Sequence, residues 1–175
     1  MNDKTIVRFA HPLLIVGILV GLVKLAQASV GNIDPAHPFA WGTNVGWINF
    51  RPTHSTVVVY FDHLEGYVWA ENIGWIRLGT HTGGGEHTYG NSGPTDYGVN
   101  NDGAGNLSGY AWSTNAGWIN FNPTHSQVTI DPDTGEFKGA AWSENIGWVR
   151  FQNTTPTYQV AAVYKRTYLP LIVKG

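Results

Sequence analysis

Trp41-Gly-Thr-Asn-Val-Gly-Trp47 decides the fold, because the same W-x-x-N-x-G-W motif occurs three more times along the chain. The later copies begin at Trp69, Trp112 and Trp142, and the four copies together contain all eight tryptophans of the protein. Such repetition is typical of a scaffold built from one repeated unit, since every copy has the same surface to bury. Active-site residues are seldom copied four times, so the pattern favours structure or multivalent binding over catalysis.

The copies fall into two alternating classes, which indicates a larger duplication. The second and fourth copies have Glu71 and Glu144 before the Asn, and Arg77 and Arg150 after the second Trp, where the first and third copies have Thr and Asn. We therefore predict two pseudo-equivalent halves. The predicted boundaries are a first half at 29–108 with a Gly-rich surface loop at 79–98, a second half at 109–156 and a C-terminal strand tail at 157–175.

Short runs of β-branched and aromatic residues alternate with Gly, Pro, Asn and Asp after residue 28, without a helical period. This pattern predicts an all-β, antiparallel fold, either sandwich-like or a flattened barrel. If each motif is a hairpin that turns near its Asn, its two Trp face each other across the strands. The copies that lack the Glu also lack the Arg, which predicts two cross-turn ion pairs, Glu71–Arg77 and Glu144–Arg150.

Strand alternation places both Trp of a motif on one face and the aliphatic residues on the other. We expect the Trp ladders to pack between sheets, since large aromatic side chains dominate protein cores. The alternative is an exposed platform that binds sugar rings or a neighbouring subunit. The aromatic residues of this platform are Trp41, Trp47, Trp69, Trp75, Trp112, Trp118, Trp142, Trp148, Tyr67 and Tyr110.

The first residues have the pattern of a secretory signal peptide, which we place at 1–28. Lys4 and Arg8 precede an apolar run at 12–23, and an A-x-A site ends at Ala28. A retained membrane anchor is the alternative, although the run is shorter than the ~20 residues that span a bilayer. We expect a secreted protein, extracellular or on the cell surface, with no membrane contact after removal of the signal.

Charge and cysteine content exclude several classes of partner and site. Three of the ten Lys and Arg but only one of the twelve Asp and Glu lie in residues 1–28, so the remaining chain is acidic. An acidic protein is not expected to bind nucleic acid. The chain has no cysteine, which excludes disulfides and thiolate metal sites.

The remaining polar clusters do not form a recognised catalytic or metal motif. His81 and His87 flank a Gly-rich stretch with Glu86, but their H-x5-H spacing is not that of a zinc helix, and a solvated loop is favoured. Asp131 and Asp133 resemble the start of a calcium loop without its later Glu, so a hairpin turn is favoured. We predict no metal, no cofactor and no enzymatic activity; a hydrolase with an unrecognised acid pair is the weakest alternative.

Two stretches are similar to known sequences. The segment GYAWSTNAGWINF at 109–121, with variants at 66–78 and 139–151, resembles Trp-rich repeats of uncharacterised secreted bacterial proteins, a resemblance that implies no activity. The ending TYLPLIVK at 167–174 is similar to a YLPL-type tail on exported proteins of Chloroflexota. These resemblances imply an exported bacterial protein.

The apolar chain end gives the leading functional hypothesis. It forms either an edge strand of the protein's own sheet or, like the extended segment 29–38, a strand that adds to the sheet of a neighbouring molecule. The residues proposed for assembly are Tyr168, Leu169, Leu171, Ile172 and Val173. We expect a non-enzymatic extracellular structural protein that polymerises with itself into a surface fibre, filament or sheath. The alternative is a carbohydrate-binding module that binds polysaccharide through its Trp and Tyr side chains.

Overall fold

Each W-x-x-N-x-G-W motif forms an antiparallel hairpin in the computed structural model, which describes residues 32–163. The hairpin strands are β1 (Ile33–Gly42) with β2 (Gly46–Asn49), β5 (Tyr67–Ala70) with β6 (Gly74–Arg77), β8 (Leu107–Ser113) with β9 (Gly117–Asn120), and β12 (Ala140–Ser143) with β13 (Gly147–Arg150). In every hairpin the two Trp are direct cross-strand partners: Trp41 and Trp47, Trp69 and Trp75, Trp112 and Trp118, Trp142 and Trp148.

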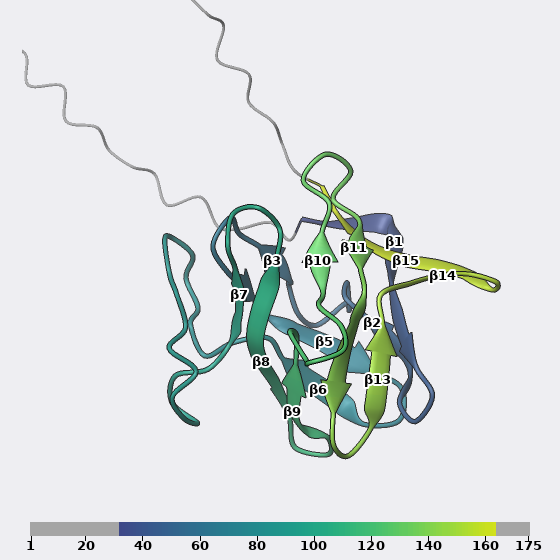
Figure 1. The fold of residues 1–175 in the computed structure, drawn as a ribbon, viewed down its shortest axis with the longest axis horizontal. Coiled ribbons are helices and arrows are strands. Elements are labelled where there is room, and N and C mark those ends of the chain that lie inside the picture. The colour runs from purple at the N-terminus through teal and green to yellow at the C-terminus, as the bar shows by residue number, and fades with distance from the viewer. Residues whose placement is uncertain (1–31, 164–175) are drawn as a thin grey trace, which may run out of the picture.

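The four hairpins join edge to edge into a closed barrel (Figure 1). The strand order is β1-β2-β5-β6-β8-β9-β12-β13, and β13 pairs with β1 through Trp41–Arg150 and Gly42–Val149 to close the ring. The predicted all-β, antiparallel class is confirmed, and the architecture is an eight-stranded closed barrel rather than a sandwich. Hairpins from both predicted halves lie in this one barrel.

Shorter strands surround the barrel. β3 (Val58–Val59) pairs with β4 (Leu64–Glu65), β10 (Thr129–Ile130) with β11 (Phe137–Lys138), and β7 (Val99–Asn101) with β8. β14 (Gln152–Thr154) and β15 (Thr157–Ala162) form a hairpin that extends away from the barrel, and β15 also pairs with β1. Figure 1 shows β10 and β11 at the opposite end of the barrel from the β8–β9 turn.

Small and branched side chains fill the barrel interior, since eight strands enclose a space only just wide enough for side chains. The buried inward residues are Ala40, Ile48, Val68, Ile76, Ala111, Ile119, Ala141 and Val149. Larger rings close the end near β10 and β11. There Phe151 lies with its ring centroid 5.6 Å from that of Phe50 and 5.7 Å from those of Phe121 and Phe137.

The hairpin turns close the other end of the barrel. The residue between the motif Asn and Gly is buried in every copy: Val45, Ile73, Ala116 and Ile146. The motif glycines have positive φ values of 70–77°, as expected for tight turns. The motif Asn residues do not share this backbone conformation, because Asn91 is the one non-glycine residue with positive φ among the described residues.

The motif Asn residues instead link each turn to its neighbour. The Nδ2 atoms of three of them donate hydrogen bonds to carbonyl oxygens of the adjacent turn: Asn44 to Ile146 at 3.1 Å, Asn115 to Ile73 at 3.0 Å and Asn145 to Ala116 at 3.0 Å. In the second turn the backbone N–H of Asn72 makes the equivalent bond to Val45 at 3.3 Å. We call this closed set of four bonds the turn ring.

Two sequence predictions fall on residues that the structure does not describe. The predicted signal peptide at 1–28 and the proposed assembly strand at 168–173 both lie outside residues 32–163. Within residues 32–163, no helix is long and apolar enough to span a membrane.

Candidate binding surface

The Trp side chains lie on the outer face of the barrel. Strand alternation places them opposite the buried Ala, Ile and Val, as predicted, but no second sheet covers them in the described part of the chain. The most exposed are Trp69 (41%), Trp75 (39%), Trp112 (37%) and Trp118 (40%), and the other four are half-buried. The expected packing of Trp ladders between sheets is therefore wrong, because the closed barrel has room inside only for smaller side chains.

In the second, third and fourth hairpins the two outward Trp rings contact each other. Ring centroids lie 5.0 Å apart for Trp69–Trp75 and 4.6 Å apart for Trp112–Trp118, with interplanar angles of 75° and 62°. Trp142 and Trp148 form a tilted pair at 4.8 Å. Tilted and edge-to-face arrangements are favoured by the quadrupoles of the rings, and they fix each indole while part of its face stays exposed.

One part of this aromatic surface is hollowed into a groove of about 740 Å³, which we call the aromatic groove. Its aromatic lining comes from Trp112, Trp118 and Tyr110 of the third hairpin, Trp142 of the fourth, and Tyr97 of the Gly-rich loop. Its polar lining residues are Asn91, Ser92, Asn120, Ser143, Glu144 and Asn145.

The Gly-rich loop forms one wall of the aromatic groove and is held by its own side chains. The Oδ1 of Asn91 accepts a hydrogen bond from Gly98 N at 3.1 Å, and the two carboxylate oxygens of Asp96 share the N–H of Gly90 at 3.1 and 3.2 Å. The Tyr97 ring packs edge-to-face on Trp118 with centroids 4.9 Å apart. Burial raises the pKa of the Tyr97 hydroxyl.

The two predicted cross-turn ion pairs do not occur in the described structure. Arg77 is the cross-strand partner of Tyr67, whereas Glu71 lies beyond the last paired residues at the turn, so the two charges sit at opposite ends of the hairpin. Arg77 instead donates to the Thr80 carbonyl oxygen at 2.9 Å and lies 5.7 Å over the Tyr67 ring. Glu71 accepts a hydrogen bond from Trp47 N at 3.1 Å.

The same register separates the second predicted pair. Arg150 is the partner of Ala140 at the start of β12, and Glu144 follows β12 at the turn. Glu144 is therefore available to the aromatic groove, which it lines.

The N-terminal assembly segment is partly engaged within its own chain. Ile33 pairs with Ala162 and Pro38 with Val160, so this part of segment 29–38 is already a strand of the protein's own sheet. The predicted turn at Asp131 does join β10 to β11, and the Asp131 carboxylate accepts hydrogen bonds from the backbone of the turn.

The Gly-rich loop brings its histidines to a site that was not among the sequence predictions. His81 and His87 stack with centroids 4.0 Å apart, and His81 lies beside His63 and Glu65, which come from an earlier part of the chain. Burial, followed by the charges of His81 and His63, lowers the pKa of His87. Glu86 is exposed.

No family model, no curated protein and no solved structure matches this chain. What the outer surface can do therefore follows from its own residues. Aromatic planes favour contact with C–H groups, and the amide and carboxylate groups beside them can bind hydroxyls.

Proposed function

We propose that the protein is a non-catalytic, extracellular carbohydrate-binding module and that the aromatic groove binds polysaccharide. The observation that carries this proposal is the exposure of Trp112 and Trp118 beside a row of amide and carboxylate side chains. A pyranose ring has C–H-rich faces and hydroxyls around its rim, so its binding needs flat aromatic surfaces together with hydrogen-bonding groups at their edges. The groove has both, and its volume is within the about 300–1,000 Å³ typical of small-molecule sites.

A polymeric ligand suits the repeated motif better than a single sugar. A second hollow of about 520 Å³ lies against Trp47, Phe39 and Tyr158, and it also contains Glu71, the residue equivalent to Glu144. Two aromatic sites on one barrel can bind separate units of the same chain, and simultaneous binding raises the overall affinity.

The number of carboxylates in the aromatic groove supports binding without hydrolysis. Glu144 is the one carboxylate among the residues that line it. Glycosidases act through a pair of carboxyl groups that flank the scissile bond, about 5–9.5 Å apart. A single acid suits a hydrogen-bonding role.

We further infer that the four hairpins are copies arranged in two tandem halves. The third residue after the last Trp of each motif makes the same backbone hydrogen bond in all four copies. Its N–H donates to the carbonyl oxygen of the residue just before the hairpin's first aligned pair: Phe50 to Pro38, Leu78 to Gly66, Phe121 to Gly109 and Phe151 to Gly139. Export is part of the proposal and is supported by the signal-like pattern of residues 1–28.

A self-assembling structural protein is the second candidate. It is supported by β14, in which Gln152, Asn153 and Thr154 are all exposed and whose partner among the described residues is β15 alone. An open strand edge is a site at which a segment of another molecule can add. The residues at 168–173 are the proposed donor.

The test is binding of a panel of soluble polysaccharides, followed by Trp fluorescence and affinity electrophoresis. We expect Trp118→Ala to weaken binding by about 30-fold, because an aromatic residue at the centre of a site contributes about 2 kcal/mol. Phe61→Ala is the matched control, since Phe61 is 77% exposed but does not line the groove. Silence of the wild-type protein across a broad panel would refute the proposal. Ordered polymers of the secreted protein in electron micrographs would favour the second candidate.

A further inference from the structure

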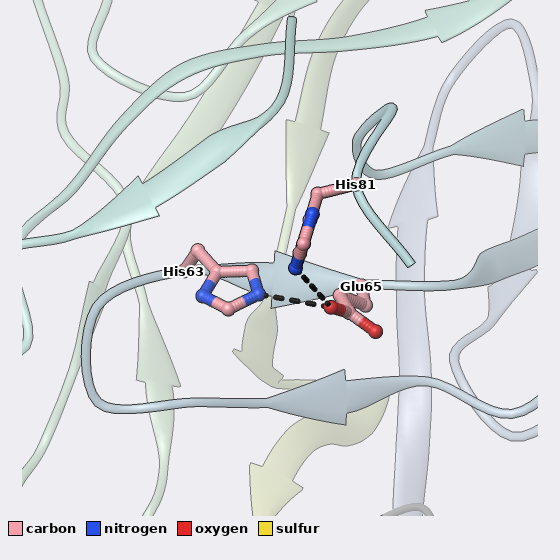
Figure 2. Close-up of side chains that lie close together, drawn as sticks. All are labelled: His63, Glu65 and His81. Carbon is pink, nitrogen blue, oxygen red and sulfur yellow. Dashed lines mark hydrogen bonds and ion pairs between the residues drawn. The ribbon is translucent and has the colours of Figure 1, made fainter. Parts of the chain in front are cut away.

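Three side chains with metal-binding atoms converge where the Gly-rich loop folds over β4 (Figure 2). The Nε2 atom of His63 lies 3.1 Å from the Oε1 atom of Glu65, and the Nε2 atom of His81 lies 3.6 Å from the same oxygen. All three ligand atoms lie within 4.8 Å of one another. In a tetrahedral zinc site with bonds of about 2.0–2.1 Å, neighbouring ligand atoms are about 3.3 Å apart. The two distances to the Glu65 oxygen, 3.1 and 3.6 Å, lie on either side of that value.

The three side chains are held in place by the surrounding structure. His63 is fully buried and Glu65 is 8% exposed at its side chain. The Glu65 carboxylate accepts hydrogen bonds from Gly83 N at 3.3 Å and Gly84 N at 3.0 Å. The ligand groups are therefore oriented by partners around them, as in known metal sites.

The contact between His63 and Asp62 selects the ring nitrogen that would bind a metal. The Nδ1 of His63 lies 2.6 Å from the Asp62 carboxylate, so it carries a proton and donates it to that oxygen. The Nε2 atom, which faces the Glu65 oxygen at 3.1 Å, is then the nitrogen that binds a metal once any proton shared with that carboxylate has left, in the carboxylate–histidine–metal arrangement found in zinc proteins. Asp62 also accepts a hydrogen bond from His87 N at 2.7 Å, which ties it to the Gly-rich loop.

We propose that His63, Glu65 and His81 bind one divalent transition-metal ion of the zinc class. Two imidazole nitrogens and one carboxylate oxygen are donors of intermediate softness, which suit Zn²⁺ better than Ca²⁺ or Mg²⁺. The ion displaces any proton held on the two Nε2 atoms, including one that His81 Nε2 donates to the Gly84 carbonyl oxygen at 3.1 Å. The His81 side chain is 30% exposed, so water can reach the ion as a fourth ligand. The ring of Tyr60 stacks on that of His63. The buried Tyr60 hydroxyl has no hydrogen-bond partner within the described part of the chain, so a polar group beside the cluster is unsatisfied.

The consequence of binding is to fasten the Gly-rich loop to the barrel. His63 and Glu65 come from the β3–β4 hairpin and its turn, whereas His81 comes from the start of the loop. An ion shared by both segments links them directly. Because the far part of the same loop forms a wall of the aromatic groove, the ion would also stabilise that wall. The site itself does not depend on the proposed sugar binding.

The test is zinc binding to the full chain after treatment with a chelator, by isothermal titration and native mass spectrometry. We expect one Zn²⁺ per chain and a higher Tm in its presence. His81→Ala and Glu65→Gln each remove a ligand and should weaken binding by more than about 100-fold, beyond the 10–100-fold typical of losing a residue that only orients a ligand. His54→Ala and Glu86→Gln are the controls, because these residues are exposed and lie outside the cluster.

Two results would overturn the proposal. One is a wild-type chain that takes up no zinc, which would make the cluster a buried hydrogen-bond network only. The other is zinc uptake by His81→Ala and Glu65→Gln equal to that of the wild type. His81→Gln, which keeps a polar side chain at this position, replaces His81→Ala if the alanine variant does not fold. X-ray absorption at the zinc edge should show two imidazole ligands.

Discussion

Alanine at Asn44, Asn115 or Asn145 removes one hydrogen bond of the turn ring, and the expected loss in the free energy of unfolding can be worked out for each. Asn44 and Asn115 donate at 3.1 and 3.0 Å to the carbonyl oxygens of buried turn residues. A hydrogen bond contributes about 1 kcal/mol, and a carbonyl left without its partner raises the cost to about 1–3 kcal/mol. We expect Asn44→Ala and Asn115→Ala to lower the free energy of unfolding by about 2 kcal/mol each.

Asn145→Ala should cost less, although its hydrogen bond is equally short. Its acceptor, the Ala116 carbonyl oxygen, also accepts a hydrogen bond from the Ser143 hydroxyl at 2.9 Å, so it keeps a partner after the substitution. We expect a loss of about 1 kcal/mol.

Asn72→Ala is a control within the same motif. In the second turn the bond is made by the backbone N–H of Asn72, which alanine retains. We expect a change within about 0.5 kcal/mol, as for an ordinary surface substitution.

The assay is urea unfolding followed by Trp fluorescence, with calorimetry as a second measurement. For a domain of about 130 residues, 1 kcal/mol corresponds to a change in Tm of about 4 °C. The expected order of Tm is therefore wild type and Asn72→Ala together, then Asn145→Ala, then Asn44→Ala and Asn115→Ala. Equal losses in all four variants would show that the Asn acts through turn conformation and not through the ring.

Two further predictions concern single residues. Gly139 has a φ of +80°, and a Cβ there would overlap the Gln127 carbonyl oxygen. Gly139→Ala should therefore lower the free energy of unfolding by several kcal/mol, measured by urea titration. Gly93→Ala should be nearly neutral, because the space around Gly93 is open. The hydrogen bond from Lys138, with those from the turn backbone, holds the pKa of Asp131 well below its usual range. Because a lowered folded-state pKa stabilises above the unfolded value, the stability difference between wild type and Asp131→Asn should be present at neutral pH and be lost on acidification below about pH 4; a difference that does not change with pH would refute this assignment.

Local pattern was enough to predict the hairpins but not their closure into a barrel. The motif places Trp41 opposite Trp47 because its turn length fixes the register. The pairing of Trp41 with Arg150 joins residues more than 100 positions apart, and nothing local determines it. Strand alternation was enough to place the aliphatic residues inside, but it did not determine whether a second sheet covers the Trp face. The closed barrel decides this, because its narrow interior takes Ala and Ile and leaves the indoles on the outside.

The candidate sites likewise have parts that the local sequence predicts and parts that only the tertiary structure brings together. The aromatic residues of the groove were identifiable from their motif, but the wall formed by Asn91 and Tyr97 depends on where the Gly-rich loop folds. For the histidine cluster, a local signal existed: His63 and Glu65 are two residues apart in an extended segment, so they share a face. Their meeting with His81 required the tertiary structure, because the spacing between His81 and His87 resembles no known metal motif.

The pairing of β15 with β1 brings the two ends of the described chain together, with Val163 N donating to the Asn32 carbonyl oxygen at 2.6 Å. In a polypeptide trimmed to residues 32–163, a short linker across this junction would close the chain into a circle. New ends could then be placed in a connection between two hairpins, away from the turn ring. Such permuted chains would keep every neighbour around the barrel. The hairpin that comes first in the sequence can thus change, while the order of the hairpins around the barrel stays the same.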